Sequence, residues 1–167
     1  MLQPCHAHAS SADQALRRGR QRHAIMKQKT QILLVDNQYW ARAALAPTID
    51  LAGDMQVAAE AEDLGGAIRL FGQLEPDIVV MEMRLPNTSG ADAIRAICRH
   101  FPWARVLALS NFAEDEDIYQ ALAAGALGCV AKGGSANELL GAIRAVTAGK
   151  KYLPLDFTAR LAKRPKH

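Results

Sequence analysis

The chain has 167 residues, is 50% hydrophobic and carries a formal net charge of +3. This length predicts one domain with a substantial core, flanked by tails. Cys5, Cys98 and Cys129 show no paired spacing, which argues against a disulfide framework or a zinc site and favours a reducing cytoplasm. No apolar stretch approaches the roughly 20 residues that cross a bilayer. The basic N-terminus also lacks the apolar segment of a secretory signal.

The net charge conceals a strong asymmetry along the chain. Residues 1–29 contain six Lys or Arg and one acid, and residues 149–167 contain the same numbers, so each tail carries +5. Residues 30–148 contain eight Lys or Arg and fifteen acids, a net charge of −7. Binding to phosphate backbones needs clustered basic side chains, so nucleic acid is not an expected partner of the middle region.

The two tails give weaker signals. Residues 1–29 lack apolar periodicity, and we predict that they are disordered. Met26 stands just before the first apolar run and is a candidate start of the protein. Two interpretations therefore stay open: residues 1–25 are an upstream leader with no role, or they are part of the working protein. A nucleic-acid-binding role for this basic arm is disfavoured, because no aromatic residue is interleaved to stack on bases. The basic tail 149–167 contains a candidate short helix at Asp156–Lys163.

From Gln31 onward, short apolar runs alternate with amphipathic stretches. This βα repeat predicts an α/β fold, in which a parallel sheet is covered by helices on both faces. The expected domain spans residues 30–148. The apolar runs are Ile32–Val35, Met55–Ala59, Ile78–Met81, Val106–Leu109 and Leu127–Ala131.

Several helix boundaries have local signals. Asp63 can cap one helix, and Ser135 with Glu138 forms a capping box before another, which Gly149 ends. Pro47 falls inside the first expected helix, where it should kink the helix or end it early.

Polar residues follow four of the apolar runs. They are Asp36, Asn37, Glu82, Ser110 and Lys132. In a doubly wound sheet, functional groups gather at the carboxyl ends of the strands. Two acids, an amide, a hydroxyl and an ammonium are therefore expected to converge on one site.

These features resemble the receiver domain of two-component response regulators. The matching stretches are Ile32–Asp36, Pro76–Pro86 and Ala124–Gly128 with Lys132, and Glu138–Leu153 is similar to receivers that precede a LuxR-type helix-turn-helix. The resemblance implies a flavodoxin-like, three-layer α/β/α fold with five helices and five parallel strands in the order 2-1-3-4-5.

The resemblance also implies a Mg²⁺ site. Asp36 corresponds to the first acid of the metal-binding pair, and Asn37 stands where the second acid is usual. The backbone carbonyl of Arg84 corresponds to a further metal ligand. Glu82 stands at the phosphoacceptor position, which is an aspartate in the family. With these departures, the resemblance implies a degenerate site that binds Mg²⁺ poorly or not at all.

The remaining roles concern the phosphoryl group. Ser110 corresponds to the hydroxyl that contacts it, and Lys132 to the lysine that pairs with the acceptor. Cys129 replaces an aromatic residue that often swings inward on activation. We expect Glu82 to pair with Lys132, and two interpretations stay open: partial mimicry of the phosphorylated state, or a decayed pocket in which the pair only balances charge.

Three functions are compatible with the sequence. The first is a non-enzymatic, atypical cytoplasmic receiver that binds a protein partner through its fourth helix, fifth strand and fifth helix. It is expected to act without phosphorylation, because Glu82 replaces the acceptor aspartate and Asn37 replaces a metal-binding acid. A sensor histidine kinase and a second copy of the chain are candidate partners, and neither a membrane nor nucleic acid is expected. The second is a LuxR-type DNA-binding regulator without its output domain. The third is a receiver that is still slowly phosphorylated on Glu82.

Overall fold

The structure is a computed structural model that describes residues 28–111 and 114–161. The predictions for residues 1–27 and for the last residues of the C-terminal tail lie outside this part. The described strands are β1 (Thr30–Val35), β2 (Met55–Ala61), β3 (Ile78–Glu82), β4 (Arg84–Leu85), β5 (Thr88–Ser89), β6 (Val106–Ser110) and β7 (Gly128–Ala131). The helices are α2 (Tyr39–Asp50), α3 (Leu64–Leu74), α4 (Gly90–His100), α5 (Asp115–Ala124), α6 (Ala136–Thr147) and α7 (Leu155–Leu161).

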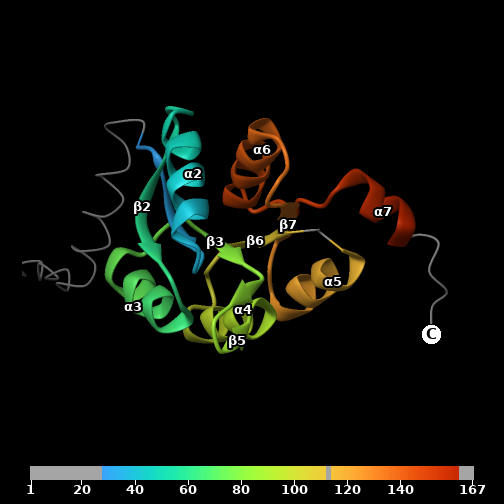
Figure 1. Cartoon of the computed structure of the whole chain (residues 1–167), viewed down its shortest axis with the longest axis horizontal. Helices are drawn as coiled ribbons and strands as arrows, with labels where there is room; N and C mark the ends of the chain where they lie inside the picture. Colours follow the sequence, from blue (N-terminus) through green and yellow to red (C-terminus); the bar gives the residue numbers. More distant parts are fainter. Residues whose placement is uncertain (1–27, 112–113, 162–167) are drawn as a thin grey trace, which may run out of the picture.

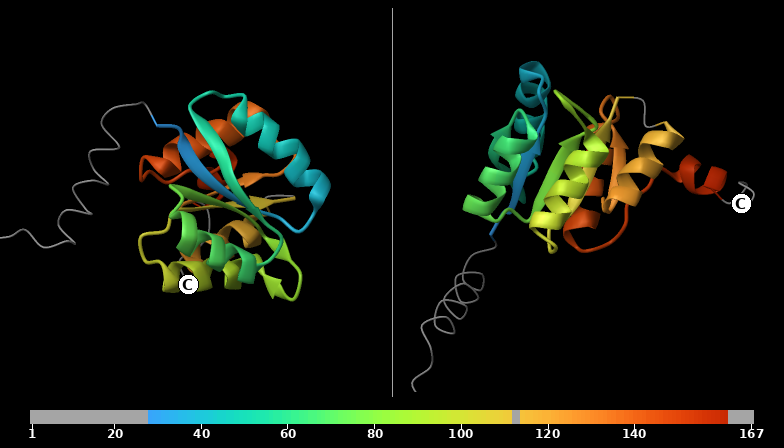
Figure 2. Two further views of the ribbon diagram at one scale, coloured as in Figure 1. Left: turned by 90° about the vertical axis from the view of Figure 1, so that its left-hand side faces the viewer. Right: turned by 90° about the horizontal axis from the view of Figure 1, so that it is seen from below.

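Five parallel strands form the central sheet in the order β2-β1-β3-β6-β7. When only the strands of this sheet are numbered along the chain, this is the predicted 2-1-3-4-5 order. Helices α2 and α6 cover one face, and α3, α4 and α5 cover the other (Figures 1 and 2). The flavodoxin-like fold with five covering helices is therefore confirmed, and α7 is a sixth helix beyond it.

The core consists of two apolar clusters, one on each face of the sheet. Side chains alternate between them along each strand, because successive residues of a strand point to opposite faces. In β1, Leu33 and Val35 join the cluster beneath α3, α4 and α5, while Ile32 and Leu34 join the cluster beneath α2 and α6. Burial on both faces explains why the strands read as continuous apolar runs.

The predicted helix caps at Asp63 and Ser135 are confirmed. Asp63 Oδ1 accepts a hydrogen bond from the Gly66 amide at 2.7 Å, and Ser135 Oγ accepts one from the Glu138 amide at 3.1 Å. Of the two outcomes predicted for Pro47, the early end does not occur, because α2 continues to Asp50 and the Leu51 amide donates to the Pro47 carbonyl.

A short antiparallel hairpin, β4–β5, follows the end of β3, and the sequence did not predict it. Asn87 makes the turn with a positive φ of 60°. Gly90 then lies against Met83 so closely that a Cβ at position 90 would be 2.3 Å from the Met83 Cα. Only glycine allows this approach, and it holds the hairpin beside the carboxyl end of β3.

No helix in the described ranges is long and apolar enough to cross a membrane.

Candidate functional site

The predicted polar residues lie where the parallel strands end. Asp36 follows β1, Glu82 ends β3, Ser110 ends β6 and Lys132 follows β7. Asp36, Glu82 and Ser110 are almost fully buried, with exposed fractions of 0%, 2% and 1%. Asn37 is the exception, because it is exposed.

The Lys132 ammonium is the centre of the site. Its Nζ lies 2.5 Å from Asp36 Oδ2 and 2.5 Å from Glu82 Oε2, and it donates to Gln38 Oε1 at 3.2 Å. The Lys132 side chain is only 8% exposed. The expected pairing of Glu82 with Lys132 is present, and Asp36 shares the same cation. We call Asp36, Glu82 and Lys132 the buried charge cluster.

Backbone amides hold the two carboxylates from their other sides. The Arg84 amide donates to Glu82 Oε1 at 3.0 Å, and the Gln38 amide donates to Asp36 Oδ1 at 2.8 Å. Each buried carboxylate therefore has one oxygen in an ion pair with the ammonium and the other hydrogen-bonded to a backbone N–H, although Asp36 Oδ2 makes only the ion pair and no hydrogen bond. Buried charges are tolerated only when they are paired and hydrogen-bonded in this way.

Ser110 has a hydrogen-bond partner that the sequence did not indicate. Its hydroxyl donates to Asp117 Oδ2 at 2.7 Å, and Asp117 lies in the first turn of α5. The Lys132 amide donates to the Ser110 carbonyl at 2.8 Å. Ser110 thus connects the strand ends to α5.

The site does not fit a divalent cation in this arrangement. Mg²⁺ prefers carboxylate and water oxygens at about 2.0–2.1 Å, but the Lys132 ammonium already lies between the carboxylates of Asp36 and Glu82. Asn37, at the position of a second metal-binding acid, adds no negative charge. No group of three or more His, Cys, Asp or Glu side chains gathers as a metal site in residues 28–111 and 114–161.

Sequence reasoning also missed Gln38 and Trp40. Gln38 supplies both a backbone donor and a side-chain acceptor to the buried charge cluster. Lys132 Nζ lies 5.7 Å from the centroid of the Trp40 ring, a cation–π distance, and Trp40 is 65% exposed. Their proximity to Asp36 in the sequence could have indicated a role at the site, because both residues lie within four residues of it.

Cys129 lies in β7 and is fully buried. Burial, the Asp117 carboxylate and the Glu82 carboxylate together raise the pKa of the Cys129 thiol to about 12. The thiol is therefore neutral at physiological pH and behaves as a small apolar side chain.

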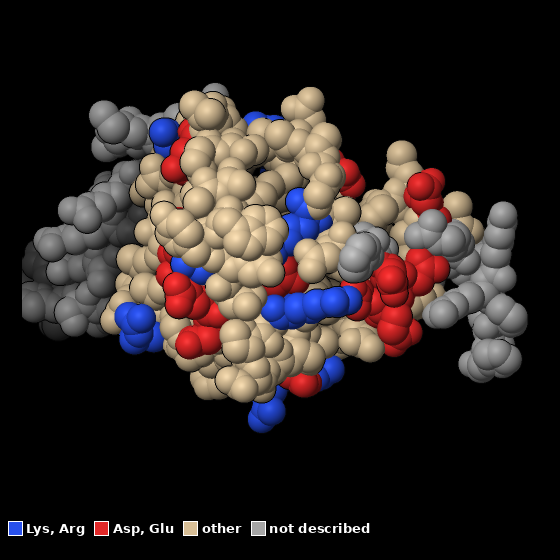
Figure 3. Space-filling view, viewed as in Figure 1, with Lys and Arg blue, Asp and Glu red and all other residues tan. Residues whose placement is uncertain are grey.

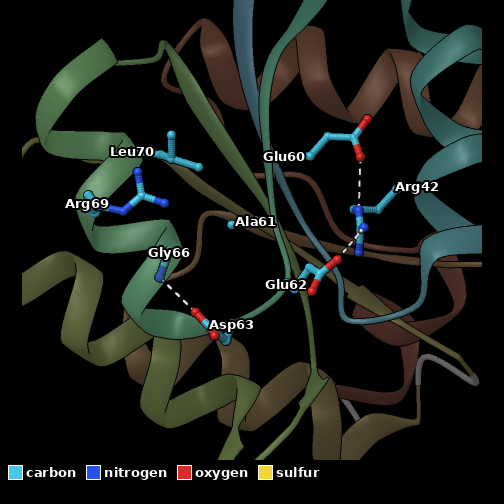
Figure 4. Close-up of a pocket in the computed structure, with 8 residues that line it drawn as sticks. All are labelled: Arg42, Glu60, Ala61, Glu62, Asp63, Gly66, Arg69 and Leu70. Atoms are coloured by element: carbon cyan, nitrogen blue, oxygen red, sulfur yellow. Dashed lines mark hydrogen bonds and ion pairs between the residues drawn. The ribbon is translucent and has the colours of Figure 1, made fainter.

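A second group of charges surrounds an open pocket of about 420 Å³ between the end of β2 and α3 (Figure 4). Arg42 pairs there with Glu60 and Glu62, at 2.9 Å each. Burial by itself would lower the pKa of Arg42, but hydrogen bonds to Glu60 and Glu62 and their charges raise it. We call Arg42, Glu60 and Glu62 the open charge cluster.

Acidic side chains gather on the molecular surface where α5 begins (Figure 3). Asp115, Glu116 and Asp117 form the first turn of α5, where negative charge is favourable.

Comparison with known proteins identifies the family. The model of the response regulator receiver domain matches residues 32–144. The transcriptional regulatory protein LiaR of Bacillus subtilis is 30% identical over 136 residues, which cover 81% of this chain and 64% of LiaR. The transcriptional regulatory protein LnrK of the same organism is 33% identical over 130 residues, which cover 78% of this chain and 59% of LnrK. The chain therefore spans less than two thirds of the length of these relatives.

Solved structures agree with this assignment. A LuxR-family two-component response regulator from Aurantimonas sp. SI85-9A1 matches with a TM-score of 0.76 at 34% identity, covering 81% of this chain and 97% of that one. The signal receiver domain of NarL from Mycobacterium tuberculosis matches with a TM-score of 0.68 at 28% identity, covering 74% and 99%. The chain belongs to the response regulator receiver family of two-component signalling, and its relatives are of the LuxR/NarL type.

Proposed function

We propose that this receiver signals without phosphorylation and regulates a protein partner by direct contact. The observation that carries the proposal is the position of Lys132 Nζ, 2.5 Å from a carboxylate oxygen of both Asp36 and Glu82. One ammonium and two backbone amides already contact the two carboxylates, so both carboxylates have partners without Mg²⁺ or a phosphoryl group.

The geometry disfavours phosphoryl transfer to Glu82. Transfer depends on an acceptor oxygen in line with the donor and on a metal ion that neutralises the developing charge. Both Glu82 carboxylate oxygens already have partners, the Lys132 ammonium and the Arg84 amide. Compared with aspartate, glutamate also moves its oxygens by roughly 1.5 Å. A misplacement of about 1 Å can cost on the order of 10²-fold in rate.

The same contacts support partial mimicry of an activated state. The longer Glu82 side chain carries its negative charge toward Lys132, which would otherwise be available to a phosphoryl oxygen. A permanent ion pair of this kind biases a two-state domain toward one conformation without any input. We propose that the regulated surface lies on α5, β7 and α6, because the Ser110–Asp117 hydrogen bond connects the strand ends to α5.

DNA-binding transcriptional regulation is a second candidate. It is favoured by the descriptions of LiaR and LnrK as transcriptional regulatory proteins, of whose length the chain spans only 64% and 59%. In that case the receiver would act on an output domain in place of a separate partner.

Treatment with acetyl phosphate and Mg²⁺, followed by intact mass measurement, tests the proposal. The wild-type chain should gain no phosphoryl group, while the double variant Glu82→Asp/Asn37→Asp should be modified. Beryllofluoride with Mg²⁺ should shift the NMR spectrum of the double variant only. A phosphoryl group on Glu82 in the wild-type protein would overturn the proposal.

A further inference from the structure

The segment after α6 returns to the edge of the sheet. The Tyr152 amide donates to the Leu127 carbonyl at 3.0 Å, and the Cys129 amide donates to the Tyr152 carbonyl at 3.2 Å. These bonds form an isolated parallel bridge between Gly128 and Tyr152. A Cβ on Gly128 would be 2.5 Å from the Tyr152 carbonyl oxygen. The glycine therefore permits the close approach of the returning chain.

This segment contributes to both core clusters. Tyr152 packs against the cluster beneath α2 and α6, whereas Leu153 packs against the cluster beneath α3, α4 and α5. Phe157 of α7 is a full member of the latter cluster, with 1% exposure. Its ring meets the Tyr119 ring of α5 edge-on, with the centroids 5.4 Å apart. Figures 1 and 2 show α7 beside α5 at the β7 end of the molecule.

Helix α7 depends on this contact for its order. It has seven residues, and isolated helices shorter than about 12 residues are marginal in water. Phe157 is its anchor, since Leu155 at its start is 89% exposed. Cys129 of β7 belongs to the same apolar cluster as Phe157.

Helix α5 contacts both Ser110 at the strand ends and Phe157 of α7. Asp117 in its first turn accepts the Ser110 hydrogen bond, and Tyr119, two residues later, packs on Phe157. A displacement of α5 at the Ser110–Asp117 hydrogen bond would therefore reach the Tyr119–Phe157 contact within one helical turn.

We propose that residues 150–161 are a detachable intramolecular cover of the α5–β7 surface, with Phe157 as its anchor. The surface accepts a short helix with one aromatic side chain, and a partner segment of that chemistry binds there once the resident helix leaves. The assignment of α5–β7 to partner binding rests on the proposed function. The detachment of the cover does not.

Hydrogen exchange on the full wild-type chain is the first test, because it needs no variant. The Cys129 amide reports the cover directly, since it donates to the Tyr152 carbonyl. We expect this amide and those of residues 155–161 to exchange at least tenfold faster than the β3 amides at the centre of the sheet. Exchange of all these amides at the β3 rate would show that the segment opens only with the whole domain, which would overturn the proposal.

The second test adds a synthetic peptide of residues 150–161 to the full chain. The Phe157→Ala variant, whose own cover is weakened, should bind the peptide at least tenfold more tightly than wild type. Leu155→Ala, at an exposed position of the same helix, should behave as wild type, and a peptide lacking the Phe157 ring should not bind. Equal binding by wild type and Phe157→Ala would overturn the proposal. A phosphoryl group on Glu82 would refute the proposed function and leave both results unchanged.

Discussion

Two clusters of one buried cation and two carboxylates meet where Arg42 contacts the Asp36 carbonyl, and they differ in the exposure of their carboxylates. Lys132 sits between Asp36 and Glu82, whose side chains are 0% and 2% exposed. Arg42 sits between Glu60 and Glu62, whose side chains are 41% and 71% exposed. The formal charge of each cluster is −1, so composition alone does not distinguish them.

The difference shows how burial gives an ion pair its effect. Water and salt screen the exposed carboxylates of the open charge cluster, and a pair whose two partners are both exposed contributes about 0–1 kcal/mol. Removal of one partner from a buried pair leaves an unpaired charge in the interior, at a cost of about 3–5 kcal/mol. The clusters also touch, because Arg42 Nη1 donates to the Asp36 carbonyl at 2.6 Å. The open cluster therefore helps to hold the loop that carries Asp36.

The largest effect is expected from Lys132→Met. This change leaves the Asp36 and Glu82 carboxylates buried without their cation, so the free energy of unfolding should fall by about 3–5 kcal/mol. Urea denaturation monitored by circular dichroism measures this change. Arg144→Met, which removes a pair with Asp54 that is half exposed on both sides, is the matched control and should have a far smaller effect. Equal effects of the two variants would show that burial does not determine how much an ion pair contributes to stability.

An intermediate effect is expected from pH, through Cys129. Its pKa is raised from 9.0 to about 12 in the folded state, so the folded chain holds the thiol proton more tightly than the unfolded chain. The resulting stabilisation is complete below pH 9 and is lost as the pH rises toward 12. The slope is at most about 1.4 kcal/mol per pH unit.

Urea denaturation across that pH range measures the slope, and Cys129→Ala should flatten it. Glu82→Gln should lower the Cys129 pKa, because the Glu82 carboxylate contributes to raising it. Glu60→Gln in the open cluster should leave this pKa unchanged. Identical slopes for the wild-type chain and Cys129→Ala would show that the Cys129 thiol does not cause the pH dependence of stability.

The smallest effect is expected from Glu62→Gln alone. The Glu62 carboxylate is 71% exposed and Arg42 keeps its pair with Glu60, so the loss of stability should be about 0–1 kcal/mol and should shrink further in high salt. Urea denaturation at low and high salt measures this difference. A loss as large as that of Lys132→Met would mean that the open cluster supports the Asp36 loop more strongly than its exposure suggests.

Local sequence signals were sufficient for the strands of the central sheet and for the strand ends at which the site residues lie. Ile32–Val35 and Ile78–Met81 read as buried strands, and the residues that follow them, Asp36 and Glu82, lie at the site as expected. The hairpin β4–β5 escaped prediction because its two-residue strands are too short to show periodicity. The continuation of α2 past Pro47 to Asp50 departs from local helix rules, which disfavour proline in a helix interior.

By itself, the sequence determined the alternation of strands and helices, the acidic character of the domain and the identity of the polar residues that close each strand. Tertiary structure decided which of these residues meet. Lys132 contacts Glu82 across 50 positions of the chain and Gln38 across 94. Ser110 turns to Asp117 on α5, and Phe157 returns to the core from beyond α6. The physical reason is that strand register and side-chain rotamers set these contacts, and neither leaves a periodic signal in the sequence.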